Sequence, residues 1–441
     1  MSVDVPIDRY PPAVDPYTPD SGNDGYHVES YDLDLHYQVR TNRLQGTAVL
    51  SVLVLAPLTR LQLDLVGLSV GETRVDGRRA KHAQSATKLT VRLPAAVPAG
   101  TRLSVEVDYA GKPRPRRTRW GTIGWEELED GSLVASQPVG SATWFPCNDT
   151  PARKSRYRIQ VRAEKGYRVR TNGVPGSHGT VGGDRVWRFH QDVPAAPYLA
   201  TVQVGRYVED EIDLGGVPGS VLYPSRLRQR VRADVHARVP AMMATFVEAF
   251  GPYPLPGYAV VVTDDELEIP TEAQGMATFG SNHVLGDQGS DRLIAHELAH
   301  QWFGNSVGVR QWRHIWLNEG FACYSEWIWS QASGGPSAAE LAARFHARLA
   351  GQPQDLVLAD PGPADMFDDR VYERGALTLH ALRTELGDEA FFDVVRSWTH
   401  DRRHSVVSTE DFEAHVRERT GRDLAGLFDA WLRRPGLPAL P

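Results

Sequence analysis

The chain has 441 residues, which at roughly 150 residues per domain indicates about three structural units, or two large ones, and excludes a single small domain. Hydrophobic residues make up 41% and charged residues 23%, a composition typical of a globular protein with a sizeable core. The chain has 48 Lys and Arg against 55 Asp and Glu, a net charge of −7, so neither nucleic acid nor a membrane surface is an expected partner.

The sequence favours a protein that stays in the cytoplasm. No apolar run approaches the roughly 18 residues of a membrane-spanning helix. The N-terminal stretch MSVDVPIDRYPPAV lacks the basic start and the apolar segment of an export signal. Cys147 and Cys323 are too few for a disulfide framework, and we expect two buried, reduced thiols. The oligomeric state stays open.

Residues 1–208 are predicted to form an all-β domain, either a sandwich or a saddle of strands. Apolar and polar residues alternate in short runs between residues 25 and 208, among them YDLDLHYQV, TAVLSVLVLA and LSVEVDYAG. Gly, Pro and Asn separate these runs at nearly regular intervals. Such a period of two with frequent turns is typical of antiparallel sheets.

Residues 209–441 are predicted to form a second domain of the α+β class that is mainly helical. Apolar residues recur at helical spacing from Val231 to Phe250, and the strand YAVVVTD follows. Helices then dominate, the last of them opened by a Ser408–Asp411 capping box. The further helices that we expect are Asp291–Phe303, Ile315–Ser330, Ala338–Ala350, Tyr372–Leu386, Glu389–Thr399 and Asp411–Thr420.

The segment HELAH within the first of these helices predicts a metal site. His296 and His300 are four residues apart, so on a helix both imidazoles leave the same face, with Cβ atoms about 5–6 Å apart. Zinc accepts neutral imidazole nitrogens, and a catalytic zinc site has three protein ligands and one open position. We expect the third ligand to be Glu319 of WLNEGFA, on the next helix.

Glu297 is predicted to act as a base rather than as a ligand. It adjoins His296 and projects beside the ligand face, where its carboxylate would take a proton from water that the metal has acidified. One Zn²⁺ per chain, held by His296, His300 and Glu319, would also polarise a peptide carbonyl.

The segments HELAHQWFG and WLNEGFA resemble the gluzincin zinc aminopeptidases of the aminopeptidase N type. The resemblance extends over nearly all of the chain, from SQPVGSATWFPCNDTP to YERGALTLHALR. It implies a β saddle followed by a thermolysin-like catalytic domain. Full-length members carry a C-terminal helical-repeat domain over the active site, so the resemblance implies a short form with a more open cleft.

The resemblance also implies roles for residues outside the zinc segment. Tyr372, in VYERGAL, takes the place of the tyrosine that hydrogen-bonds the oxyanion. The family's Gly-x-Met-Glu-Asn signature is degenerate: Gly275 and Met276 remain, but Ala277 stands where its glutamate is expected. We therefore align Glu272 with the glutamate that binds the substrate's amine. In the family, a residue of the β domain forms a second anchor for the amine, and Gln137 stands near that position. Gly275 and Met276 complete the predicted substrate-binding residues.

The resulting hypothesis is a zinc metallopeptidase that removes N-terminal residues from peptides with a free N-terminus. A zinc endopeptidase, or a hydrolase of another small substrate such as an epoxide, would use the same zinc site without the amine anchor. A non-catalytic scaffold of the same fold is the third hypothesis. The presence of the ligands, the base and the tyrosine together argues against it, because a scaffold does not need them.

Overall fold

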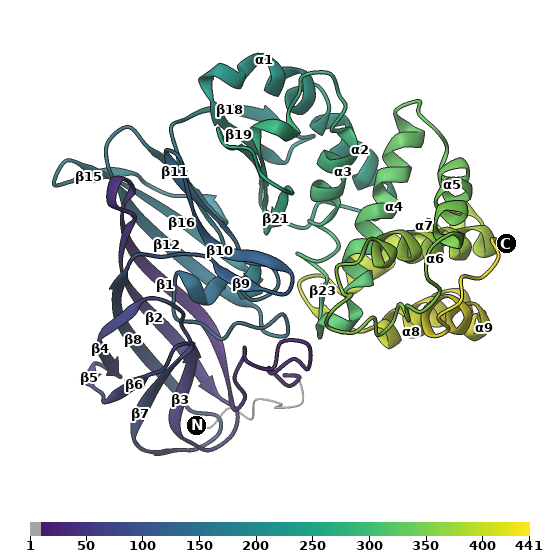
Figure 1. Ribbon diagram of the computed structural model, residues 1–441. Coiled ribbons are helices and arrows are strands. Elements are labelled where there is room, and N and C mark those ends of the chain that lie inside the picture. Colours follow the sequence, from purple (N-terminus) through teal and green to yellow (C-terminus); the bar gives the residue numbers. More distant parts are fainter. Residues whose placement is uncertain (1–9) are drawn as a thin grey trace. The chain divides into compact units, whose positions relative to one another are not determined.

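The computed structural model describes residues 10–441. Residues 1–9, on which part of the expectation about export signals rests, lie outside the described residues. The chain divides into two compact units, Met1–Val208 and Glu209–Pro441 (Figure 1).

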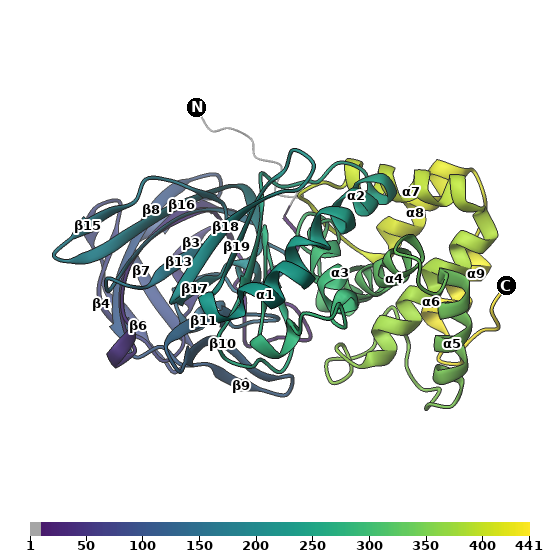
Figure 2. The same ribbon diagram turned by 90° about the horizontal axis from the view of Figure 1, so that it is seen from above.

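A nine-stranded sheet is the main element of the first unit. Its strand order is β14-β16-β12-β1-β2-β8-β4-β5, and β15 pairs with β16. Strand β1 pairs in parallel with β12 and antiparallel with β2, and the long strands curve along their length (Figure 2). The strands are β1 (Tyr26–Gln38), β2 (Arg43–Val54), β4 (Ser69–Val75), β5 (Arg78–Arg79), β8 (Arg102–Gly111), β12 (Ser155–Ala163), β14 (Val174–Pro175), β15 (Gly179–Val181) and β16 (Asp184–Ala195).

Two smaller sheets complete this unit. One has the order β3-β7-β6, and the other β13-β17-β11-β10-β9. The inward residues of the three sheets form one apolar core, to which β1 contributes Leu33, Leu35 and Tyr37 at alternate positions. The alternation in the sequence is thus explained by one buried face per strand. The strands are β3 (Leu58–Asp64), β6 (His82–Gln84), β7 (Lys88–Val97), β9 (Arg116–Thr118), β10 (Gly121–Leu128), β11 (Gly131–Ala135), β13 (Arg168–Thr171) and β17 (Val202–Gly205).

The chain enters the second unit within β18, the first strand of a five-stranded sheet of order β18-β19-β20-β22-β21. Strand β20 lies at its centre, is buried throughout and runs parallel to both neighbours, β19 and β22. Strand β21 occupies the edge, where it pairs with β22 in antiparallel orientation. The strands are β18 (Tyr207–Asp213), β19 (Pro218–Pro224), β20 (Tyr258–Val262), β21 (Thr271–Ala273) and β22 (Met276–Phe279).

Helices make up most of the remainder of the second unit, and a two-stranded parallel sheet of β23 (Gly308–Val309) and β24 (Val406–Val407) joins two of the connecting segments. Helix α8 opens with the predicted capping box, because Ser408 accepts a hydrogen bond from the Asp411 amide and Asp411 accepts one in return. The helices are α1 (Arg228–Val231), α2 (Val239–Phe250), α3 (Asp291–Ala299), α4 (Trp316–Ala332), α5 (Ala338–Ala350), α6 (Asp369–Leu386), α7 (Asp388–Asp401), α8 (Thr409–Thr420) and α9 (Ala425–Phe428).

Two predicted helices differ from those observed. The segment from Val231 to Phe250 is not one helix, because a π-helical stretch over Arg232–His236 separates α1 from α2. Helix α3 ends at Ala299 instead of Phe303, because the hydrogen bonds of the next turn join residues three apart, from the Gln301 amide to the Leu298 carbonyl and from the Trp302 amide to the Ala299 carbonyl. Among residues 10–441, no helix is long and apolar enough to cross a bilayer.

Candidate metal centre and active site

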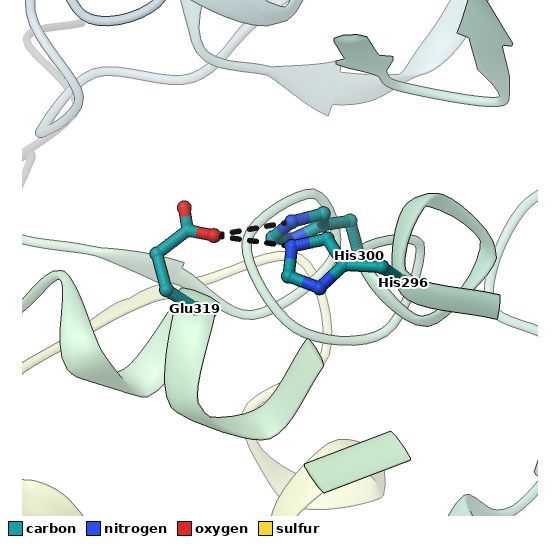
Figure 3. A group of neighbouring side chains, drawn as sticks. All are labelled: His296, His300 and Glu319. Carbon is teal, nitrogen blue, oxygen red and sulfur yellow. Dashed lines mark ion pairs between the residues drawn. The ribbon is translucent and has the colours of Figure 1, made fainter. Parts of the chain in front are cut away.

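Two histidines of the second unit point their Nε2 atoms at one carboxylate oxygen. His296 lies in the last turn of α3, and His300 forms its C-cap. Each Nε2 atom lies 3.4 Å from Oε2 of Glu319, which belongs to the first turn of α4 (Figure 3). The i, i+4 spacing on α3 therefore brings the two imidazoles to the same carboxylate, as the sequence predicts.

The other ring nitrogen of each histidine has a hydrogen-bond acceptor of its own. The Nδ1 atom of His296 lies 2.7 Å from Oε1 of Glu326, and that of His300 lies 3.0 Å from the Phe303 carbonyl oxygen. Since these oxygens only accept, each Nδ1 donates the hydrogen bond, and Nε2 is the ring nitrogen left to face Glu319 and to bind a metal. Such outer partners orient the rings and fix the tautomer that binds a metal.

The electrostatics of this group favour a bound cation. Burial alone would raise the pKa of Glu319, but the two histidines outweigh it and lower that pKa to about 2. Burial alone would lower the pKa of His300, but Glu319 and Glu272 raise it to about 9. Positive charge at the meeting point of these side chains is thus strongly stabilised.

The residues at this point fit a zinc ion. Two imidazole nitrogens and one carboxylate oxygen are the ligand set of a catalytic zinc site with a fourth position open. One ligand atom from each of His296, His300 and Glu319 lies within 4.8 Å of the other two. In addition, Oε1 of Glu319 is buried and has no hydrogen-bond partner among residues 10–441. A buried carboxylate oxygen without a partner is costly unless a cation is nearby.

Two further carboxylates adjoin the histidines. Atoms of Glu272, Glu297 and His300 lie within 4.8 Å of one another. The Oε2 atom of Glu297 is buried without a hydrogen-bond partner in the described part of the chain. Burial raises the pKa of Glu297, and Glu319 acts in the same direction, while both histidines oppose them. Glu297 is therefore suited to holding a proton for part of a reaction.

Glu272 lies in the hairpin of β21 and β22. It is 8% exposed and pairs with Ala277 across the hairpin. Burial, and then Glu319 and Glu297, raise its pKa to about 8 against the opposing effect of His300. Gly275 occupies the turn with a φ of 76°, and Met276 is buried in β22. A cationic group beside Glu272 would favour its carboxylate form.

Tyr372 comes from helix α6 and lies over His296. The ring centroids are 6.0 Å apart with an interplanar angle of 22°. Burial, followed by the carboxylates of Glu319 and Glu272, raises the pKa of Tyr372 well above its usual value. Its hydroxyl thus stays protonated at neutral pH and can donate a hydrogen bond.

A pair of glycines brings the helices of Glu319 and Tyr372 together. Gly320 of α4 faces Gly375 of α6 so closely that a Cβ atom on Gly375 would lie 2.7 Å from the Gly320 Cα atom. Only glycine at both positions permits this approach of two backbones. Because Gly320 adjoins Glu319, and Gly375 lies three residues after Tyr372, the crossing fixes the spacing of these two side chains.

Gln137 lies in the first unit, after β11. Its peptide bond to Pro138 is cis, and its side chain is half-buried. Its assignment as a second amine anchor stays a prediction.

Sequence reasoning missed three of the supporting residues, Glu326, Gly320 and Gly375. Glu326 follows Glu319 by seven residues, two helical turns, so the two carboxylates lie on the same face of α4. That spacing was a signal for a second acidic residue near the histidines. The glycine crossing had no comparable signal, because its two residues are 55 positions apart in the sequence.

Comparisons with known proteins agree with this architecture. Residues 27–199 match the Peptidase M1 N-terminal domain, and residues 235–431 match the Peptidase family M1 domain. Among solved structures, an M1 zinc metallopeptidase from Deinococcus radiodurans is 29% identical with a TM-score of 0.87; the match covers 98% of this chain and 99% of that one.

Curated relatives include the leucyl aminopeptidase of Saccharolobus solfataricus, 24% identical over 93% of this chain and 54% of the relative. Aminopeptidase M1-B of Oryza sativa is 25% identical over 93% of this chain and 50% of the relative. The chain thus spans about half the length of these curated relatives. With two domains of one family covering most of its length, the chain belongs to the M1 peptidase family.

Proposed function

We propose that the chain is a zinc-dependent aminopeptidase that hydrolyses N-terminal residues from peptides. The observation that carries the proposal is the approach of His296 Nε2 and His300 Nε2 to one oxygen of Glu319, at 3.4 Å each, with Glu297 close by. Membership of the M1 family supports it, as does the likeness to the Deinococcus radiodurans metallopeptidase, also solved with a Tyr-Ser-Ala substrate.

In this proposal His296, His300 and Glu319 hold one zinc ion per chain. When bound, zinc would act as a Lewis acid that polarises the scissile carbonyl and lowers the pKa of water to near neutral. Glu326 and the Phe303 carbonyl oxygen hold the two rings in the ligating tautomer.

Glu297 is the proposed base and acid of the reaction. Its Oε2 atom takes a proton from the attacking water and later returns it to the leaving amine nitrogen. The buried position of Glu297 raises its pKa, which favours holding the proton between these two events. Tyr372 donates a hydrogen bond to the carbonyl oxygen as negative charge develops there, an effect that is strong in a site screened from water.

Glu272 is the proposed anchor of the substrate's α-ammonium group, with Gln137 as a second acceptor and Gly275 and Met276 beside it. The edge position of β21 and the closeness of Glu272 to His300 support this role. A charged anchor beside the zinc ligands would select the peptide bond that follows the first residue.

The proposal includes peptides with a free N-terminus as substrates and a cytoplasmic location. The free, buried thiols of Cys147 and Cys323 support a reducing compartment.

The first prediction concerns Glu297. Replacement by Gln (Glu297→Gln) keeps the shape of the side chain but removes the proton acceptor. We expect zinc content near one per chain and a fall in kcat of roughly 10²- to 10⁴-fold, the usual contribution of general acid–base catalysis. Zinc is measured by elemental analysis and kcat with aminoacyl fluorogenic substrates, with and without a chelator.

Glu248→Gln is the matched control, because Glu248 is an exposed carboxylate on α2. It should behave like the wild type. Turnover by Glu297→Gln close to that of the control would contradict the role of the base.

The second prediction concerns the amine anchor. Glu272→Gln should raise KM for a peptide with a free N-terminus by roughly 10- to 100-fold, because the negative charge that pairs with the ammonium group is lost. The wild type should leave the N-acetylated form of the same peptide uncut. Glu268→Gln, an exposed acid in the preceding loop, is the control and should leave KM unchanged. Comparable cleavage of the acetylated peptide would instead support the endopeptidase hypothesis.

The third prediction concerns the crossing of α4 and α6. Gly375→Ala should push the helices apart and displace Tyr372 from Glu319, lowering kcat by roughly 10²-fold. The loss should approach that of Tyr372→Phe, while bound zinc is retained. Gly426→Ala is the control, since Gly426 lies in helix α9 with open space around it. Equal kcat values for the two alanine variants would exclude a positioning role for the crossing.

A further inference from the structure

Two amide side chains join the end of the metal-binding segment to the hairpin of β21 and β22. Gln301 directly follows His300, Asn305 lies four residues further on, and both are fully buried. Nδ2 of Asn305 donates to the Ala273 carbonyl oxygen at 2.9 Å. Oε1 of Gln301 accepts from the Gly275 amide at 2.8 Å. We call Gln301 and Asn305 the amide latch.

Nε2 of Gln301 completes the latch. It lies 3.3 Å from the Ala273 carbonyl oxygen and 3.4 Å from that of Met276, both in the hairpin. The same nitrogen lies 3.3 Å from the Glu297 carbonyl oxygen in α3. One buried side chain thus contacts the backbone of the base and the backbone on both sides of the hairpin turn.

The strand that carries Glu272 is short. Strand β21 comprises only Thr271–Ala273 and is paired on one side, with β22. Three residues paired along one edge are a short ladder for holding a buried carboxylate within 4.8 Å of a histidine. Both latch residues contact the carbonyl of Ala273, the residue after Glu272, and Gln301 also holds the turn at Gly275.

We propose that Gln301 and Asn305 are positioning residues that fix Glu272 relative to His300 and so determine how tightly the site binds a substrate's free amine. The proposal rests on the proposed function, in which Glu272 binds that amine. The side-chain hydrogen bonds of the latch described above go to backbone groups, so the proposed effect on Glu272 is exerted through the backbone next to it.

The test compares two inhibitors of the zinc-loaded full chain. Leucine hydroxamate has a zinc-binding hydroxamate and a free amine, whereas 4-methylpentanoyl hydroxamate has the same carbon skeleton without the amine. The ratio of their inhibition constants therefore measures the contribution of the amine alone. We expect the wild type to bind the amine-bearing compound more tightly and Glu272→Gln to lose most of this preference.

Gln301→Met keeps the approximate length of the side chain and removes its amide. We expect the preference for the amine-bearing compound to fall by about tenfold, the inhibition constant of the compound without the amine to stay within about twofold, and the zinc content to stay unchanged. Asn305→Leu removes the hydrogen bond to the Ala273 carbonyl and should give a smaller loss in the same direction. Gln354→Met is the control, because Gln354 also bridges backbone groups, through bonds to Leu349 and Leu437.

Three results would overturn the proposal. Equal weakening of both hydroxamates would show that the latch supports the zinc site as a whole. An unchanged ratio in Gln301→Met and Asn305→Leu would show that the hairpin holds Glu272 by itself. Failure of both variants to fold with zinc would assign the latch to domain stability.

These outcomes are separable from failure of the proposed function. If the wild type shows no preference for the amine, or if Glu272→Gln keeps that preference, the anchor role of Glu272 is wrong whatever the latch variants do. If both behave as expected and only the latch variants fail to respond, the proposed function stands without the latch.

Discussion

The site depends on one electrostatic constraint: two imidazoles and a carboxylate are held against each other where water is largely excluded. His300 and Glu319 are each only 2% exposed. In such surroundings a buried carboxylate that lacks a positive partner is destabilising, and the pKa of Glu319 is held far below its usual value by the two histidines. Positive charge between these three side chains therefore stabilises the site. A divalent ion would supply this charge, with the neutral Nε2 atoms of the two rings as its ligands.

Each member of this group is held by a different part of the fold. Hydrogen bonds at the Nδ1 atoms orient the two rings. Glu326 of α4 holds His296, and the Phe303 carbonyl oxygen, in the turn after α3, holds His300. The glycine crossing of α4 and α6 sets the separation of Glu319 and Tyr372. Sheet pairing holds the two strands of the Glu272 hairpin together, and the buried amides of Gln301 and Asn305 connect the hairpin to the segment after α3. The site is thus assembled from short sequence segments that long-range contacts bring together.

The sequence predicted the parts of the site that lie within single segments. The pairing of His296 and His300 follows from helical periodicity alone, and the strands of the first unit follow from alternation with one buried face. The position of Glu319 needed the added expectation that neighbouring helices pack together. The family resemblance, rather than any spacing rule, pointed to Tyr372 and Glu272.

The remaining features depend on contacts that local patterns do not encode. The π-helical stretch at Arg232–His236 interrupts an apolar periodicity that is continuous in the sequence. Strands β21 and β22 are three and four residues long, too short for a period of two to stand out. The early end of α3 at Ala299, where the hydrogen-bond spacing changes, was not evident from the helical pattern.

Zinc titration of the chelator-treated chain by calorimetry, with Glu319→Ala as the comparison, measures whether the three side chains form a metal site. We expect one zinc site per wild-type chain and a loss of affinity of roughly 100-fold or more in the variant, because one of three ligands is gone. Absence of zinc binding by the wild type, or equal affinity in the two proteins, would contradict this expectation.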